Sequence, residues 1–144
     1  MPALSYSHGV SDVPLLGETI GANLERTVAR FGDRDAVVSC HQGVRMSYAE
    51  LDAAVDRVAS GLLAAGLQKG DRVGIWSPNC AEWVVVQFAT AKAGVILVNI
   101  NPAYRTHEVE YAGLMFTRIT PAFAVANCTT THSCLLYTSP SPRD

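Results

Sequence analysis

Residues 70–98 read GDRVGIWSPNCAEWVVVQFATAKAGVILV and decide the fold class. The segment Arg72–Trp76 follows a Gly-Asp turn and is short and rich in β-branched and aromatic residues, so it predicts a buried strand. The apolar run Val95–Val98 predicts a second buried strand. A helix between them would complete a βαβ unit, in which a right-handed crossover joins two parallel strands. We therefore predict an α/β fold.

The segment between the two strands, residues 80–93, has conflicting propensities. Val84-Val85-Val86 favours a strand, whereas the length of the segment favours a helix. Asn79 can cap the start of a helix, and Gly94 can end one in the left-handed conformation. We predict a nearly all-buried helix with Asn79 as its cap.

The chain upstream predicts a helix and then a hairpin. From Glu18 onward apolar residues recur at helical spacing until Gly32-Asp33 ends the pattern. Two short strands, Ala36–Val38 and Val44–Met46, follow and are joined by a polar turn around Gln42-Gly43. The apolar stripe of the helix consists of Ile20, Leu24, Val28 and Phe31.

A capping box at Ser47–Glu50 predicts the start of the next helix, because the serine hydroxyl and the glutamate carboxylate can each accept a free backbone N–H. Gly66 is placed to end this helix. Thr106 predicts a cap for a last helix beginning at His107, with Glu108 and Glu110 near its positive end. The apolar stripe after the capping box consists of Leu51, Val55, Val58, Leu62 and Ala65.

Composition excludes several classes of function. The 144 residues are 49% hydrophobic and 17% charged, and their net charge of −2 includes no basic run suited to nucleic acid. The most apolar stretch, Val84–Val98, is interrupted by Gln87, Lys92 and Gly94 and is too short to cross a bilayer, so we expect no transmembrane segment. Met1–Gly17 lacks the features of a secretion signal, so we expect a cytoplasmic protein.

Two loops are candidates for ligand binding. Ser77-Pro78-Asn79 ends the first strand, where open α/β sheets bind ligands, although a purely structural role with Asn79 as a cap is favoured. Tyr104-Arg105 follows the second strand, and its guanidinium could face an anion, although a solvated salt bridge is favoured. Trp76 and Trp83 are expected to be core aromatics.

The cysteines and histidines predict no catalytic or metal site. The four cysteines show no CxxC pair, so we expect reduced thiols. Cys128, His132 and Cys134 have the chemistry of zinc ligands but lack a fourth ligand, and we attribute their proximity to chance. We therefore assign no catalytic, cofactor-binding or metal-binding residue. The isolated histidines, expected at the surface or beside helix caps, are His8, His41 and His107.

Four motifs occur in a fixed order along the chain. They are VPLLGETI (13–20), SYAEL (47–51), GDRVGIW followed by SPNCAEW (70–83), and QFATAKAG running into VNINPAYR (87–105). Through them the stretch Leu4–Ala112 closely resembles the start of fatty-acyl-CoA synthetases of the adenylate-forming (AMP-binding) superfamily, particularly the medium-chain branch.

The resemblance implies a ligase that requires ATP, Mg²⁺ and coenzyme A, with a fatty acid as its small-molecule partner. A carboxylate attacks the α-phosphate of ATP to give an acyl-adenylate and pyrophosphate, and the thiol of coenzyme A then displaces AMP. Such chemistry depends on charge neutralisation and on placement of the carboxylate. Two alternatives stay open: another adenylate-forming enzyme (an aryl-CoA ligase or a peptide-synthetase adenylation domain), and a non-catalytic fragment or binding module.

The family's phosphate-binding loop is expected beyond the last matching residue, and the sequence contains neither GxxxxGK[ST] nor GxGxxG. We therefore expect this chain to be an inactive fragment that binds none of the three cofactors.

The resemblance and the composition together predict four segments. Residues 1–17 form an extended arm, and residues 18–112 form an incomplete N-terminal subdomain of an AMP-binding domain. Residues 113–144 carry only three charged residues, and sequence periodicity is lost there. We interpret 113–133 as uncertain and possibly frame-shifted, and 134–144 as an artefactual tail that resembles a translated sequencing adapter.

Overall fold

The computed structural model describes residues 12–13, 15–105, 107–108 and 135–138. The predicted α/β class is confirmed, and every strand and helix predicted between residues 18 and 100 is present. In chain order the elements are α1 (Ile20–Phe31), β1 (Asp35–Ser39), the 3₁₀ turn η1 (Cys40–Gln42), β2 (Val44–Ser47), α2 (Tyr48–Ala64), β3 (Arg72–Trp76), α3 (Ala81–Ala93), β4 (Ile96–Ile100) and β5 (Leu135–Thr138).

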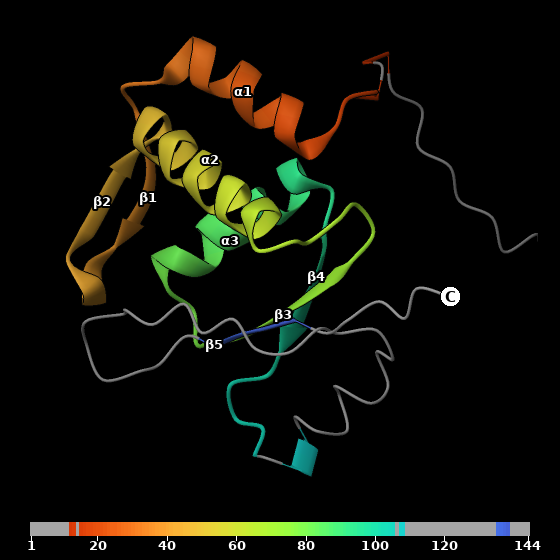
Figure 1. The fold of residues 1–144 in the computed structure, drawn as a ribbon. Coiled ribbons are helices and arrows are strands. Elements are labelled where there is room, and N and C mark those ends of the chain that lie inside the picture. The colour runs from red at the N-terminus through yellow and green to blue at the C-terminus, as the bar shows by residue number, and fades with distance from the viewer. Residues whose placement is uncertain (1–11, 14, 106, 109–134, 139–144) are drawn as a thin grey trace, which may run out of the picture.

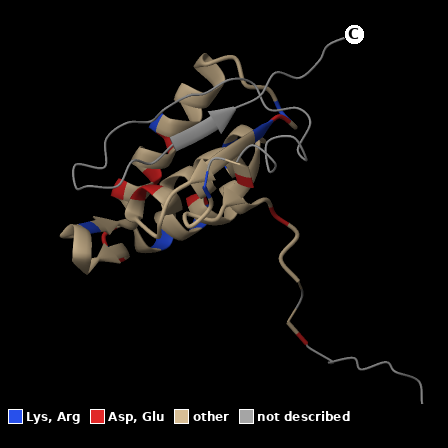
Figure 2. Ribbon diagram, turned by 90° about the horizontal axis from the view of Figure 1, so that it is seen from below, with Lys and Arg blue, Asp and Glu red and all other residues tan. Residues whose placement is uncertain are grey.

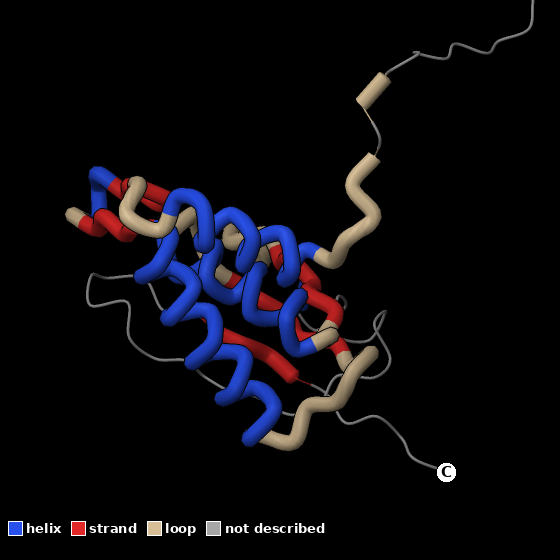
Figure 3. Tube along the Cα trace, turned by 90° about the horizontal axis from the view of Figure 1, so that it is seen from above, coloured by secondary structure: helices blue, strands red, loops and turns tan. Residues whose placement is uncertain are grey.

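The helices form a layer over one face of a small sheet (Figures 1 and 3). The sheet has the order β4-β3-β5, and β1 and β2 form a separate antiparallel hairpin beside the helices. Strands β3 and β4 are parallel and in register, from Arg72 opposite Ile96 to Trp76 opposite Ile100. The parallel pairing predicted for the βαβ unit is therefore confirmed.

Strand β5 occupies the other edge of β3. It runs antiparallel, with Val73 opposite Thr138 and Trp76 opposite Leu135. The four residues of β5 belong to the segment 134–144 that we interpreted as an artefactual tail. The origin of that segment, like the division of the chain into four segments, stays a prediction.

The predicted capping box at the start of α2 is confirmed. Ser47 Oγ accepts a hydrogen bond from the backbone N–H of Glu50 at 3.3 Å, and the backbone N–H of Ser47 donates to Glu50 Oε2 at 2.8 Å. These bonds lower the pKa of Glu50, the largest effect coming from the backbone N–H of Ser47, because they favour the charged carboxylate. Gly66 follows the helix with a positive φ of 92°, as the sequence predicted.

Helix α3 is confirmed, but its predicted cap is wrong. The N-cap residue is Cys80, which makes no side-chain cap hydrogen bond, and Asn79 lies exposed one residue earlier. Gln42 of the hairpin supplies the cap instead, because its Oε1 accepts the backbone N–H of Ala81 at 2.8 Å. Gly94 ends the helix with a φ of 72°, the left-handed conformation that the sequence predicted.

The core lies between the helix layer and β3. Leu24 of α1 is buried, whereas Ile20, the first residue of the predicted stripe, is 60% exposed. Trp83 packs against the core, and Trp76 is half-buried. The buried core residues are Leu24, Leu51, Val55, Ala59, Leu62, Leu67, Val73, Ile75, Val85, Val86, Ala89 and Val95.

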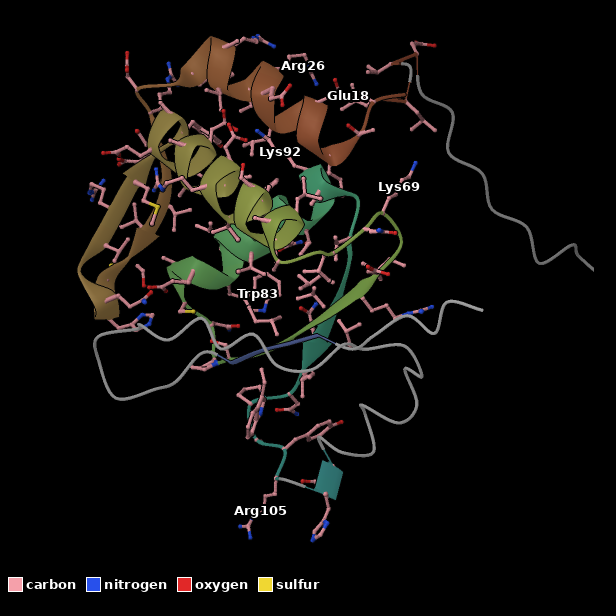
Figure 4. All side chains as sticks on the ribbon, viewed as in Figure 1. Glu18, Arg26, Lys69, Trp83, Lys92 and Arg105 are labelled. Atoms are coloured by element: carbon pink, nitrogen blue, oxygen red, sulfur yellow. The ribbon has the colours of Figure 1, made fainter. Side chains whose placement is uncertain are left out.

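Lys92 joins the three helices (Figure 4). From α3 its ammonium contacts Asp52 Oδ1 and Asp56 Oδ1 of α2, each at 2.7 Å, and Glu25 Oε1 of α1 at 3.4 Å. Burial lowers the pKa of Lys92, but its hydrogen bonds to Asp52 and Asp56 outweigh burial, so the net shift is upward. The ammonium is therefore held in its charged form among the helices.

Charges of both signs are interspersed over the described part of the chain (Figure 2). On the outer side of α1, for example, Arg26 forms a salt bridge with Glu18 (Figure 4). No helix among the described residues is long and apolar enough to span a membrane.

Candidate functional site

The candidate site is the edge of the sheet at which β3 and β4 end. Because the two strands are parallel and Trp76 lies opposite Ile100, the loops that follow them leave from the same edge. These loops are Ser77–Cys80 and Asn101–Arg105, and together they contain both of the ligand-binding candidates predicted from the sequence. Ligands of open α/β sheets bind at this kind of edge.

The loop after β3 is held by its own polar groups. Ser77 is buried, and its hydroxyl donates to the carbonyl of Pro78 at 2.9 Å. The same oxygen lies 3.4 Å from Cys80 Sγ. Ser77 is thus fully explained by local structure, whereas Pro78 and Asn79 are exposed at the rim.

The loop after β4 is organised by Asn101. Its side-chain Oδ1 accepts the backbone N–H of Ala103 at 2.9 Å, and its carbonyl accepts the backbone N–H of Tyr104 at 3.0 Å. The same carbonyl accepts the indole N–H of Trp76 at 3.1 Å. Asn101 therefore ties the second loop to the end of β3 and fixes the two loops relative to each other.

Arg105 extends from the end of this loop, away from the helix layer (Figure 4). Tyr104 and Arg105 are exposed, and no described residue forms a salt bridge with the Arg105 guanidinium. The backbone N–H of Arg105 donates to Glu108 Oε2 at 2.6 Å. Thr106 and Glu110 lie outside the described residues, so the predicted last helix stays a prediction.

The described residues contain no group of three or more His, Cys, Asp or Glu side chains that could hold a metal ion. The set Cys128, His132 and Cys134 lies outside the described part of the chain, as does His8. His41 is exposed as predicted, with its Nδ1 3.3 Å from Ser39 Oγ in the hairpin. In the part of the chain that the structure describes, this edge thus offers polar loops and the exposed cation of Arg105.

Sequence reasoning missed Gln42, which reaches the base of the first loop from the hairpin. Its amide nitrogen donates to Glu82 Oε2 at 2.9 Å while its amide oxygen caps α3. Burial raises the pKa of Glu82, but hydrogen bonds from Gln42, its own backbone and Cys80 outweigh burial, so the net shift is downward. A cysteine at a position where helices prefer Ser, Thr, Asp or Asn was the one sequence signal that a cap must come from elsewhere.

The fold and this edge define a scaffold with a ligand-facing rim, and comparison with known proteins identifies its class. A model of the family described as AMP-binding enzyme matches residues 24–127. The chain therefore belongs to the AMP-binding enzyme family, and the predicted resemblance is confirmed.

The individual proteins to which the chain is similar have narrower descriptions than the family. The chain is 54% identical over 108 residues to the medium-chain acyl-CoA ligase ACSF2, mitochondrial, of Danio rerio, an alignment that covers 75% of this chain. A fatty acyl CoA synthetase of Mycobacterium tuberculosis is structurally similar, with a TM-score of 0.64, 34% identity, and coverage of 66% of this chain and 19% of that one. The N-terminal domain of FACL13 from the same organism gives a TM-score of 0.64 and 34% identity, with coverage of 66% and 24%.

The matched region is a small part of these relatives. It spans 18% of the length of the Danio rerio ligase. The structural neighbours confirm the predicted fold, the N-terminal part of the large α/β domain of adenylate-forming enzymes.

Proposed function

We propose that this chain is the N-terminal piece of an ATP-dependent acyl-CoA ligase. The parent enzyme would convert a carboxylate, ATP and coenzyme A to acyl-CoA, AMP and pyrophosphate through an acyl-adenylate. The match of residues 24–127 to the AMP-binding enzyme family carries the proposal. The similarity to a protein named medium-chain acyl-CoA ligase favours medium-chain fatty acids as substrates.

This chain would contribute scaffold and a loop edge to the parent. The capped helices and the parallel pair β3–β4 hold Ser77–Cys80 and Asn101–Arg105 at one edge, where Arg105 presents an exposed positive charge suited to an anionic substrate. We assign no catalytic, ATP-binding or coenzyme A-binding role to any residue of this chain. Nor do we assign an Mg²⁺ site to it.

Thioester formation by the full-length parent tests the proposal. We expect octanoate to give acyl-CoA, AMP and pyrophosphate in equal amounts, with lower kcat/KM for acetate, palmitate and benzoate. A preference for benzoate would favour an aryl-CoA ligase. Amino-acid-dependent adenylation without transfer to coenzyme A would favour a peptide-synthetase adenylation domain. Either result would overturn the proposal.

A cytoplasmic location for the parent is a further part of the proposal. The Danio rerio relative carries the word mitochondrial in its name, so a mitochondrial parent is the competing possibility. Fractionation of cells that express the full-length protein with a C-terminal tag separates the two, and recovery in the mitochondrial fraction would contradict our proposal.

A further inference from the structure

We propose that Gln42 is a positioning residue that fixes the loop Ser77–Cys80 at the candidate site, from a hairpin far away in sequence. The role in catalysis rests on the proposed function, whereas the mechanical role of Gln42 does not. Residues 40–42 and the start of α3 lie side by side (Figure 1), and two hydrogen bonds join them across sequence separations of 39 and 40 residues.

Both ends of the Gln42 amide are used. Its oxygen accepts the backbone N–H of Ala81 at 2.8 Å and the hydroxyl of Ser39 at 2.7 Å, and its nitrogen donates to Glu82 Oε2 at 2.9 Å. Gln42 and Glu82 are both half-buried, so these bonds form with reduced competition from water. The amide is therefore oriented by three partners.

The capping of α3 from another element is what gives Gln42 control over the loop. A helix normally takes its cap from its own N-cap side chain, which then moves with the helix. Cys80 makes no such bond, so the free N–H of Ala81 depends on the hairpin. Ala81 directly follows the loop, and the start of α3 is thereby tied to η1.

The contacts continue from Gln42 into the loop itself. The Cys80 thiol contributes to the downward shift in the pKa of the Glu82 carboxylate that Gln42 holds, and Cys80 Sγ lies 3.4 Å from Ser77 Oγ. A substitution of Gln42 should therefore alter the contacts at both ends of the loop, while the core around Val73 keeps its packing.

A swap of the two side chains tests the tether in the 144-residue chain. Gln42→Glu keeps an acceptor for Ala81 but places a second carboxylate against Glu82. The double variant Gln42→Glu with Glu82→Gln restores one hydrogen bond between the two positions, with the donor now at position 82 and the acceptor at position 42. Gln87→Glu, the same chemical change at an exposed position of α3, is the matched control.

Amide exchange and thiol alkylation report on the loop. In a Cys40→Ser, Cys128→Ser, Cys134→Ser background, we expect Gln42→Glu to speed exchange at Ala81 and alkylation of Cys80 about fivefold. Repulsion from the Glu82 carboxylate should move the new side chain away from Ala81, and about fivefold is the factor typical of a lost cap. The swap should return both rates to within about twofold of the parent background, and Gln87→Glu should leave them unchanged. Exchange at Val73 should not change in any variant.

An equal increase in the amide exchange rates of Ala81 and Val73 would mean that Gln42 only stabilises the whole fold. If the double variant did not restore the exchange and alkylation rates, the pair Gln42–Glu82 would not be the tether. Either result overturns the inference.

The same variants in the full-length parent test the effect on catalysis. We expect Gln42→Glu to lower kcat/KM for acyl-CoA formation about fivefold and the double variant to restore it. Unchanged kinetics alongside faster loop exchange would overturn the positioning role. An inactive wild-type parent would instead refute the proposed function, because the exchange and alkylation results are obtained without turnover.

Discussion

At the scale of single residues, Lys92 shows how one charge joins three helices. Its side chain is only 11% exposed and contacts carboxylates from α1 and α2. Of these acids, Asp52 is the best shielded from water, whereas Asp56 and Glu25 are largely exposed. The interaction with Asp52 should therefore contribute most, since solvent weakens the other two.

We predict that Lys92→Met lowers the free energy of unfolding by about 1–3 kcal/mol, because it leaves three carboxylates facing one another without a cation. Urea unfolding followed by tryptophan fluorescence in dilute solution measures the change. Lys69→Met is the control, since Lys69 is exposed and makes no salt bridge among the described residues. Equal stability of the two variants would show that the cluster contributes nothing.

The capping box gives a prediction about acid pH. The pKa of Glu50 is lowered in the folded chain, chiefly by the backbone N–H of Ser47, so its contribution to stability is present above the ordinary value of 4.5 and is lost as pH falls through the lowered pKa. Glu50→Gln should therefore reduce the loss of stability below about pH 4.5. Unfolding curves from pH 7 to pH 3 test this, and parallel pH profiles for the two proteins would contradict it.

At the scale of elements, local sequence accounts for most of the fold. The capping box, the strand Arg72–Trp76 and the glycine after α3 act through neighbours in the chain, so the sequence alone predicts them. Helix α3 resisted a clear prediction because it is covered from several sides and Val85 and Val86 are both buried, which removes the usual polar face.

The predicted cap of α3 failed because its outcome depends on a contact that is distant in sequence. Asn79 is not the cap because a side chain from the hairpin fills that role. A contact of this kind leaves no periodic signal in the sequence. The position of the candidate site could be predicted from the βαβ order, whereas the tether at Gln42 could not.

The face that α2 buries gives a matched pair of substitutions. Leu62 is 6% exposed and Leu63, its neighbour on the same helix, is 51% exposed. We predict that Leu62→Ala costs about 2–4 kcal/mol through the cavity it leaves, whereas Leu63→Ala changes stability by less than about 0.5 kcal/mol. Urea unfolding of both variants measures this, and similar losses would mean that α2 is oriented differently.

At the scale of the whole molecule, the described part of the sheet has an edge that could pair with further strands. A helix layer covers one face of the sheet, β5 pairs with one side of β3, and the outer edge of β4 pairs with no strand among the described residues. Ile96 of β4 is also exposed. Such edges favour pairing with another chain.

We therefore predict that the 144-residue chain self-associates as its concentration rises, whereas the full-length parent does not do so through this edge. Sedimentation velocity across a hundredfold concentration range tests this. A species that stays monomeric and melts in one sharp transition would show that the chain is complete as a folding unit.

We propose that this chain carries the scaffold of an acyl-CoA ligase, and we expect it to catalyse no adenylation by itself. Octanoate-dependent exchange of labelled pyrophosphate into ATP tests it most directly, with the 144-residue chain and the full-length parent measured side by side. We expect exchange by the parent and none above background by the chain. Exchange by the chain alone, abolished by removing octanoate, would contradict the account.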